Sequence, residues 1–172
     1  MRRPGSRSLA ATLVALAIAA GTACFGPYHF VGGGLPANVK TVAVLPFENQ
    51  TPMPELQREL YDVMRRDVES RLGLREASES RANAVVRGTI VRYEPDLPIA
   101  FSTNPNQATA ARRKLQIVVD VEIIDQSSGK PLWQRQGLTV EGEYNERQEA
   151  QGRREALRKL VDQVVEGAQS QW

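Results

Sequence analysis

Cysteine and histidine are the residue types found most often in nucleophilic and metal sites, and this sequence contains only one of each. Cys24 is the one cysteine and His29 the one histidine among the 172 residues. A single cysteine forms no internal disulfide and supplies no paired thiolates for a metal. His29 lies in a stretch rich in glycine and proline, with no second histidine, so no histidine-based triad is indicated. We expect no catalytic residue, no metal site and no cofactor.

Two further patterns are better explained by structure than by chemistry. Asp120 and Glu122 form a pair of carboxylates, but they alternate with apolar residues, as on the solvent face of a strand. Three glycines at 32–34 precede an expected strand, whereas a phosphate-binding glycine loop follows a strand and opens a helix. Neither pattern predicts an active site, so a periplasmic enzyme is the weakest of the functions considered.

The segment before Cys24 is typical of an exported protein. Arg2, Arg3 and Arg7 precede an apolar run over residues 9–20, and small residues then lead to the cysteine. A basic start, a short apolar run and small residues indicate a secretory signal. The run of about 12 residues is too short to cross a bilayer, which needs about 20.

The four residues Gly21-Thr22-Ala23-Cys24 resemble the cleavage box of bacterial lipoproteins, in which the cysteine becomes a lipidated N-terminus. We therefore predict a signal peptide over residues 1–23, a lipidated Cys24 with a flexible tether over 24–38, and a single α+β domain over 39–172. Phe25 stands where an aspartate commonly retains lipoproteins at the inner membrane, so we expect the outer membrane, on its periplasmic side. The alternative is an ordinary signal peptide that leaves one free thiol.

The overall charge of the chain does not indicate an affinity for nucleic acid. The leader holds three of the 22 basic residues and none of the 20 acidic ones, so residues 24–172 carry 19 basic against 20 acidic side chains. A net charge of −1 provides no extended basic surface. We expect no nucleic-acid partner, and any anionic ligand must meet a local group of cations.

The first half of the domain indicates a strand, a helix and a second strand. Residues 40–47 are rich in β-branched residues and are expected to form a strand, whose ladder ends at Pro46 because proline has no N–H to donate. Pro54 opens a helix whose apolar stripe runs to Gly73, a residue suited to a helix end. Residues 82–93 form the second strand, parallel to the first, because a helix connects them. The proline-containing residues 94–111 are expected to form a long loop.

The second half predicts a hairpin and a helix. Residues 114–124 alternate strictly between apolar and polar side chains, which indicates one buried and one solvated face. A turn over 125–130 leads to a strand over 131–144, and residues 147–169 carry a helical apolar stripe. The resulting fold class is α+β, in the order β-α-β-β-β-α, with two helices packed on one face of a four-stranded mixed sheet.

A series of motifs, in this order, resembles the LptE family of lipoproteins that act in lipopolysaccharide (LPS) assembly. The lipidated cysteine is followed by Gly26-Pro27-Tyr28-His29-Phe30, Leu35-Pro36, Thr41-Val42-Ala43-Val44, Phe47-Glu48-Asn49-Gln50-Thr51, Ala82-Asn83-Ala84-Val85-Val86-Arg87-Gly88, Ser128-Gly129-Lys130-Pro131-Leu132-Trp133 and a C-terminal helix running to Trp172. The resemblance covers nearly all of the chain after the signal. It implies a non-enzymatic outer-membrane lipoprotein that plugs the β-barrel protein LptD, helps it to assemble, and assists LPS delivery to the outer leaflet.

This resemblance implies two sets of contact residues. Cations that could meet LPS phosphates are expected on the second and third strands, at Arg87, Arg92, Arg112, Arg113 and Lys114; the alternative is a solvated strand edge that deters aggregation. Apolar side chains of the long loop, Leu97, Ile99 and Phe101, are expected to contact the barrel, with Phe101 as the main anchor. The alternative is that they fold back onto the domain.

A second family offers a different function. Val42-Ala43-Val44-Leu45-Pro46-Phe47 and Asn49 are also similar to the start of CsgG and TolB N-terminal domains, which are periplasmic interaction modules of secretion or envelope regulation. Both interpretations predict a binding module rather than an enzyme. They differ in the protein with which the chain would co-purify.

Overall fold

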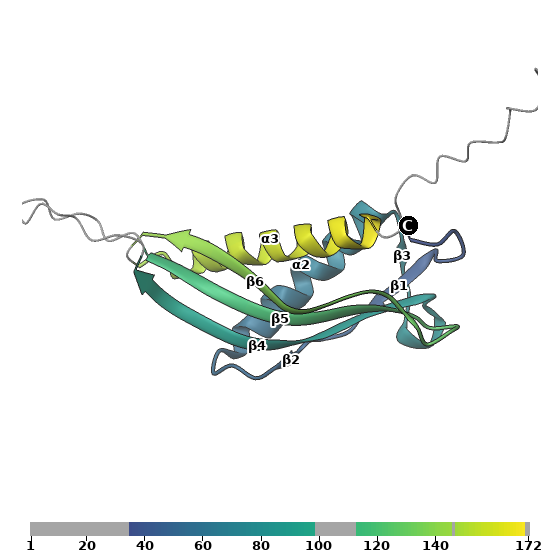
Figure 1. Cartoon of the computed structure of the whole chain (residues 1–172), viewed down its shortest axis with the longest axis horizontal. Coiled ribbons are helices and arrows are strands. Elements are labelled where there is room, and N and C mark those ends of the chain that lie inside the picture. Colours follow the sequence, from purple (N-terminus) through teal and green to yellow (C-terminus); the bar gives the residue numbers. More distant parts are fainter. Residues whose placement is uncertain (1–34, 99–112, 146, 171–172) are drawn as a thin grey trace, which may run out of the picture. The chain divides into compact units, whose positions relative to one another are not determined.

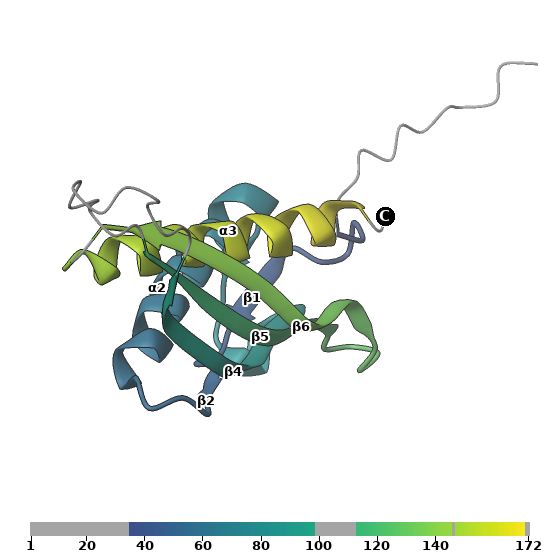
Figure 2. The ribbon, with the colours of Figure 1, turned by 60° about the vertical axis from the view of Figure 1, so that its left-hand side comes forward.

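The computed structural model describes residues 35–98, 113–145 and 147–170, which Figures 1 and 2 show as ribbons. Cys24 and His29 lie outside the described residues. In chain order the elements are β1 (Thr41–Val44), β2 (Glu48–Asn49), α2 (Pro54–Leu72), β3 (Arg75–Glu76), a 3₁₀ turn (Glu79–Arg81), β4 (Ala84–Pro98), β5 (Arg113–Asp125), β6 (Pro131–Tyr144) and α3 (Glu149–Ser170).

The sheet is mixed, as expected, but it has six strands rather than four. Its order is β3-β1-β4-β5-β6, and β2 also pairs with β4. β1 and β2 are parallel to β4, whereas β4, β5 and β6 form an antiparallel meander. The helix-connected strands β1 and β4 are therefore parallel neighbours, as predicted.

The two additional strands correct the expected element order. Residues 40–47 were expected to be one strand and 48–53 a loop, but β1 ends at Val44 and pairing with β4 resumes at Glu48. Pro46 has no N–H to donate, so the ladder is interrupted and then continues on the same neighbour. β3 is a two-residue strand that pairs with β1 directly after α2.

β4 also corrects the expected loop over 94–111, because it continues to Pro98 and pairs with β5 as far as Arg113. The pairing register shifts twice, between Ile90 and Arg92 and between Glu94 and Leu97. Such irregularities bend a strand and allow an extra residue without ending the ladder. Proline and acidic residues after Tyr93 therefore mark an irregular strand rather than the start of a loop.

Both helices pack on one face of the sheet, where the main core lies. Ala84, Val86 and Ile90 of β4 and the alternating apolar residues of β5 join the buried sides of α2 and α3 in a single cluster. The opposite face carries only a small apolar cluster around Ala43, Ala82 and Val85. We call this second face, which no helix of the described part covers, the open face.

Local sequence explains how α2 begins and ends. Pro54 occupies the first helical position, where its missing N–H costs nothing. Gly73 follows the helix with φ of 65°, and its N–H bonds to Glu69 O. Only glycine adopts this conformation without strain, so the chain turns here into β3.

α3 lies along β6, as Figure 2 shows, and glycines bring the two elements into backbone contact. A methyl group placed on Gly142 of β6 would lie 1.8 Å from Gly152 O of α3. Farther along the helix, Gly167 leaves room for the indole of Trp133, whose Nε1 would lie 2.3 Å from an added methyl. The helix therefore fits against β6 at two levels because these positions have no side chain.

Candidate functional site

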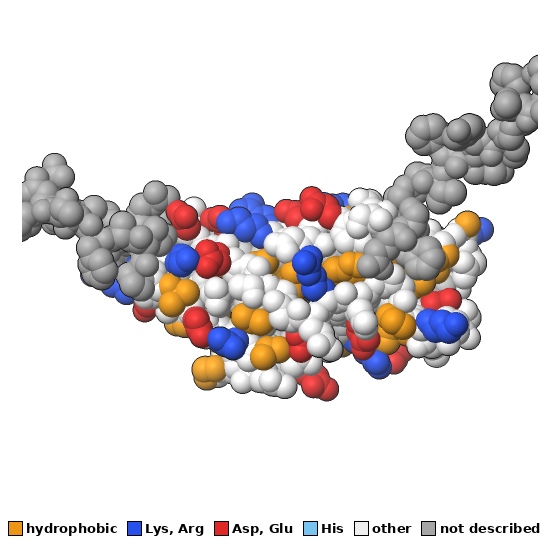
Figure 3. Space-filling model, viewed as in Figure 1, with side chains coloured by type: hydrophobic (Ala, Val, Ile, Leu, Met, Phe, Trp, Pro, Cys, Tyr) orange, Lys and Arg blue, Asp and Glu red, His pale blue; other side chains and the backbone are white. Residues whose placement is uncertain are grey.

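The predicted cations of the sheet are placed on neighbouring strands, and each described one lies beside a carboxylate. The shortest ion-pair distances are 2.7 Å for Arg87–Glu122, 3.4 Å for Arg92–Glu94, 2.9 Å for Arg113–Asp96 and 2.9 Å for Lys114–Glu141. Arg112 lies outside the described residues. Figure 3 shows basic and acidic side chains interspersed over the face in view.

These cations do not converge on one point. Arg87 and Arg92 are five positions apart on β4, a distance of about 16 Å along a strand. Arg87 lies opposite Glu122 and Arg92 opposite Val118, both polar or half-buried positions of the open face. A hollow of about 280 Å³ adjoins Arg87, and Glu48 and Glu122 also line it. Exposed ion pairs contribute only about 0–1 kcal/mol each, so these cations can exchange carboxylates for another anion at little cost.

Lys114 of the open face shares its carboxylate partner with a second donor. Its Nζ donates to Glu141 Oε1 on β6, and Gln116 Nε2 donates to the same oxygen at 3.4 Å. The hydrogen bond from Lys114 holds the pKa of the Glu141 carboxyl below its usual value. This pair joins β5 to β6 at the end of the sheet where residues 99–112 connect β4 to β5.

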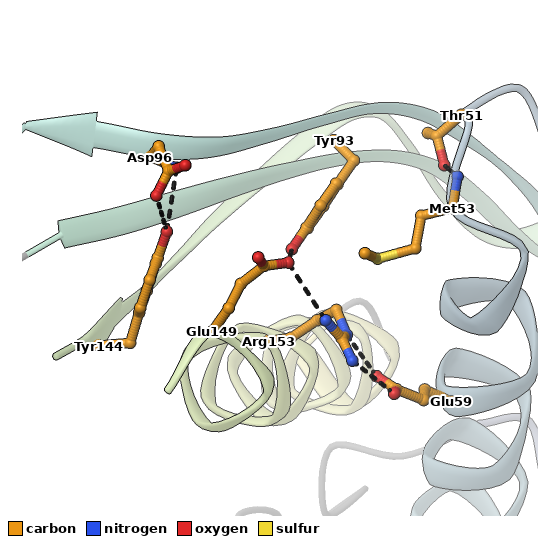
Figure 4. A network of polar contacts seen from close by, with 8 residues as sticks. All are labelled: Thr51, Met53, Glu59, Tyr93, Asp96, Tyr144, Glu149 and Arg153. Carbon is orange, nitrogen blue, oxygen red and sulfur yellow. Dashed lines mark hydrogen bonds and ion pairs between the residues drawn. The ribbon is translucent and has the colours of Figure 1, made fainter. Parts of the chain in front are cut away.

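The same end of the sheet carries a polar cluster on the helix side. The Tyr144 hydroxyl donates to Asp96 Oδ1 at 2.6 Å and accepts from the Asp96 N–H at 3.1 Å (Figure 4). The hydroxyl of Tyr144 and then the guanidinium of Arg113 lower the pKa of Asp96. Asp96 has φ of 64°, a conformation that aspartate tolerates better than most residues. The hydrogen bonds between Asp96 and Tyr144 therefore stabilise β4 at its second register shift, between Glu94 and Leu97.

A second polar cluster joins three elements beside the first. Arg153 of α3 binds Glu59 of α2 with two parallel hydrogen bonds of 2.8 and 2.9 Å, and its third nitrogen lies 3.3 Å from Glu149. Tyr93 of β4 donates to Glu149 (Figure 4). The side chain of Arg153 is only 12% exposed. The hydrogen bonds to Glu59 raise the pKa of Arg153, and burial raises that of Tyr93.

The predicted apolar contact residues fall partly within the structure. Leu97 is half-buried in β4, opposite Lys114 of β5, rather than in a loop. Ile99 and Phe101 lie outside the described residues. The structure therefore fixes the strand ends from which residues 99–112 depart, and the cluster of Asp96 and Tyr144 lies at those ends.

No group of three or more potential metal ligands occurs in the described residues. Within the same residues, no helix is both long and apolar enough to cross a membrane.

Comparison with known proteins identifies the family. A family model for LptE, described as lipopolysaccharide-assembly, matches residues 39–167. The chain belongs to the LptE family. No curated protein matches the sequence.

The fold of this LptE-family chain is shared with solved structures of low sequence identity. A PelC dodecamer from Paraburkholderia phytofirmans is 17% identical with a TM-score of 0.52, covering 80% of this chain and 95% of that one. A second PelC structure, of a variant, is 16% identical with a TM-score of 0.50, covering 82% and 94%. A minor lipoprotein from Acinetobacter baumannii is 17% identical with a TM-score of 0.47, covering 78% and 94%. At these identities the PelC structures show a common fold and no common function.

Sequence reasoning missed the two polar clusters of this LptE-family domain. Arg153 precedes Ala156 and Leu157 by three and four positions, so it lies on the buried stripe of its helix. A charge on such a stripe indicates a partner across the interface, here Glu59. Asp96 gave no comparable signal, because its contact with Tyr144 depends on an irregular strand that periodicity does not reveal.

Proposed function

We propose that this LptE-family chain is a non-enzymatic outer-membrane lipoprotein that plugs the LptD β-barrel, helps it to assemble, and assists LPS delivery to the outer leaflet. The match of the family model to residues 39–167 supports this function. The open face and the polar cluster around Asp96 and Tyr144 are polar surfaces that a partner could contact. No catalytic arrangement of side chains was found among the described residues. The alternative module of the CsgG or TolB kind has no comparable support.

Co-purification from the native membrane tests this function directly. We expect LptD to co-elute with the lipoprotein after mild detergent extraction and to remain bound through size-exclusion chromatography. Recovery of a secretion or envelope component in place of LptD would favour the alternative module. Recovery of neither protein, with the lipoprotein intact, contradicts both functions.

The anchor is proposed to be acyl chains on Cys24. Each buried CH₂ contributes about 0.8 kcal/mol, and two or more chains make release from the membrane negligible. Cys24→Ala is therefore expected to release the protein to the periplasm or to leave an uncleaved precursor. Membrane fractionation with immunoblotting measures this. A Cys24→Ala protein that is still cleaved and still fractionates with the outer membrane contradicts the anchor.

The barrel contact is proposed to involve Leu97, Ile99 and Phe101. We expect the double change Ile99→Ser and Phe101→Ser to reduce co-purification with LptD while leaving the thermal midpoint of the protein nearly unchanged, because an interface residue is exposed in the isolated protein. Leu97→Ser is measured separately, since Leu97 is half-buried in β4. A midpoint loss above about 5 °C for the double variant, roughly 1 kcal/mol or more, would instead place both side chains in the core.

The LPS contact is proposed to involve Arg87, Arg92, Arg112, Arg113 and Lys114. The four of these that the structure describes pair with partly exposed carboxylates. We expect the triple change of residues 112–114 to glutamine to weaken binding of purified LPS about tenfold, roughly 1.4 kcal/mol, and to reduce its dependence on salt. The matched control is Arg58→Gln, Arg75→Gln and Arg135→Gln, three exposed arginines elsewhere on the domain. Equal affinities of the triple variant and wild type across a salt series would remove these cations from the LPS contact.

A further inference from the structure

α2 and α3 run side by side in the same direction and are bridged at two levels. Arg153 of α3 binds Glu59 near the start of α2. Asp162 of α3 pairs with Arg71 near the end of α2, and Gln169 Nε2 donates to Arg71 O at 3.4 Å. The order of these contacts along both helices shows that they are parallel. The helix surface between the two bridges is therefore held in a fixed geometry.

A groove of about 320 Å³ lies between these bridges on the solvent side of the helices. Its lining residues are Val63, Arg66, Asp67, Gln151, Arg154 and Arg158. Three of the six are arginines, and one is a carboxylate. The groove is thus locally basic although the chain after the signal has a net charge of −1.

The arginines of this groove differ from the cations of the sheet. Among the described residues, no carboxylate pairs with Arg154 or Arg158. Arg66 uses its Nε for a hydrogen bond to the Asp62 carbonyl oxygen, which leaves its terminal nitrogens available. Asp67 lies 3.9 Å from Arg71, which it partly neutralises. An anion entering the groove therefore meets guanidinium groups without first displacing a carboxylate.

The geometry favours a compact anion. Arg154 and Arg158 are one turn apart on the same side of α3, and Arg66 faces them from α2 across a hollow of a few hundred cubic ångströms. Guanidinium groups bind phosphate with paired, charge-assisted hydrogen bonds. An acidic peptide would instead be matched by cations along an extended line, whereas these three guanidinium groups surround a single hollow.

We propose that the groove between α2 and α3 is a binding site for a phosphate-bearing ligand, held by Arg66, Arg154 and Arg158. The ligand is either a free phosphate compound or a phosphate monoester on a lipid headgroup. Val63 and the alkyl stems of the arginines provide an apolar wall beside the phosphate. This proposed binding site is formed by this chain alone and does not depend on contact with a β-barrel partner.

Titration of the purified full-length lipoprotein in neutral maltoside detergent tests this site. The probes are inorganic pyrophosphate, the soluble short-chain lipid dihexanoyl phosphatidic acid, dihexanoyl phosphatidylcholine as a lipid without a monoester, and a hexaglutamate peptide. We expect pyrophosphate, phosphatidic acid or both to bind. Phosphatidylcholine and hexaglutamate are expected to bind at least tenfold more weakly than the phosphate probe that binds. Binding of pyrophosphate alone identifies a free phosphate ligand, and stronger binding of phosphatidic acid identifies a headgroup.

The variant Arg154→Gln with Arg158→Gln is expected to weaken binding of the active probe at least tenfold. Both side chains are exposed, so the thermal midpoint should be unchanged, and a circular dichroism melt checks this. The control Arg75→Gln with Arg135→Gln removes the same charge from exposed positions away from the groove and is expected to retain the wild-type affinity. Absence of binding by both phosphate probes, equal losses in the two variants, or tighter binding of hexaglutamate would overturn the proposal.

Discussion

Gly142→Ala is expected to destabilise the domain by about 3 kcal/mol, the upper part of the range for overpacking. The added methyl group would lie 1.8 Å from Gly152 O, a backbone atom that cannot move without displacing α3 from β6. For a domain of this size the loss corresponds to a thermal midpoint lower by about 10 °C. A melt followed by circular dichroism measures it.

The control for Gly142→Ala is Gln134→Ala on the same strand. Gln134 is exposed, and surface substitutions usually change stability by less than about 0.5 kcal/mol. If Gly142→Ala melted within 2–3 °C of this control, about 1 kcal/mol, the close contact between β6 and α3 would be disproved.

Arg153→Met is expected to cost about 2–4 kcal/mol. Removing one partner of a buried pair typically costs 3–5 kcal/mol, because the remaining charge stays uncompensated. The cost expected here is lower than that typical range because the charge left behind, on Glu59, is partly solvated: its side chain is 29% exposed, against 12% for Arg153. Glu149 would also lose its cation while still accepting from Tyr93. Urea denaturation, which reports the free energy of unfolding, measures the loss.

Two further variants distinguish the contribution of the ion pair to stability from the contribution of side-chain packing. Arg154→Met alters the neighbouring arginine, which is exposed and has no carboxylate partner among the described residues, so its stability should change by less than about 0.5 kcal/mol. Adding Glu59→Gln to Arg153→Met should restore part of the loss, because the carboxylate that Arg153 had compensated is then removed. Equal stabilities of Arg153→Met and Arg154→Met would show that the pair contributes nothing.

Periodicity predicted the elements whose patterns repeat over many residues. The strict alternation of β5 and the apolar stripes of both helices identified those elements, and Pro54 and Gly73 located the ends of α2. The parallel pairing of β1 with β4 followed from the helix between them. These features are local in sequence, so sequence alone was sufficient.

The short and irregular elements could not be predicted in the same way. β2 and β3 are two residues long, and they are strands only because β4 and β1 lie beside them. The extension of β4 through Pro95 and Asp96 depends on Tyr144, 48 residues away. Among the candidate sites, the cations of the sheet were found by residue type, whereas their carboxylate partners and the basic groove between the helices required the tertiary structure.

The position of β4 at the centre of the pairing order has a consequence for how the chain folds. β1 and β2 pair only with strands that follow them, and β1 meets β4 across 42 positions of sequence. Asn83, at the start of β4, also holds the beginning of β1, because its Oδ1 accepts from the backbone N–H groups of Lys40 and Thr41. Before β4 has emerged, β1 can pair only with the two-residue strand β3, and β2 has no partner among the described strands. In contrast, β4, β5 and β6 form a meander of sequential neighbours. Folding is thus expected to begin in the C-terminal half, and the half that emerges first is the last to be incorporated.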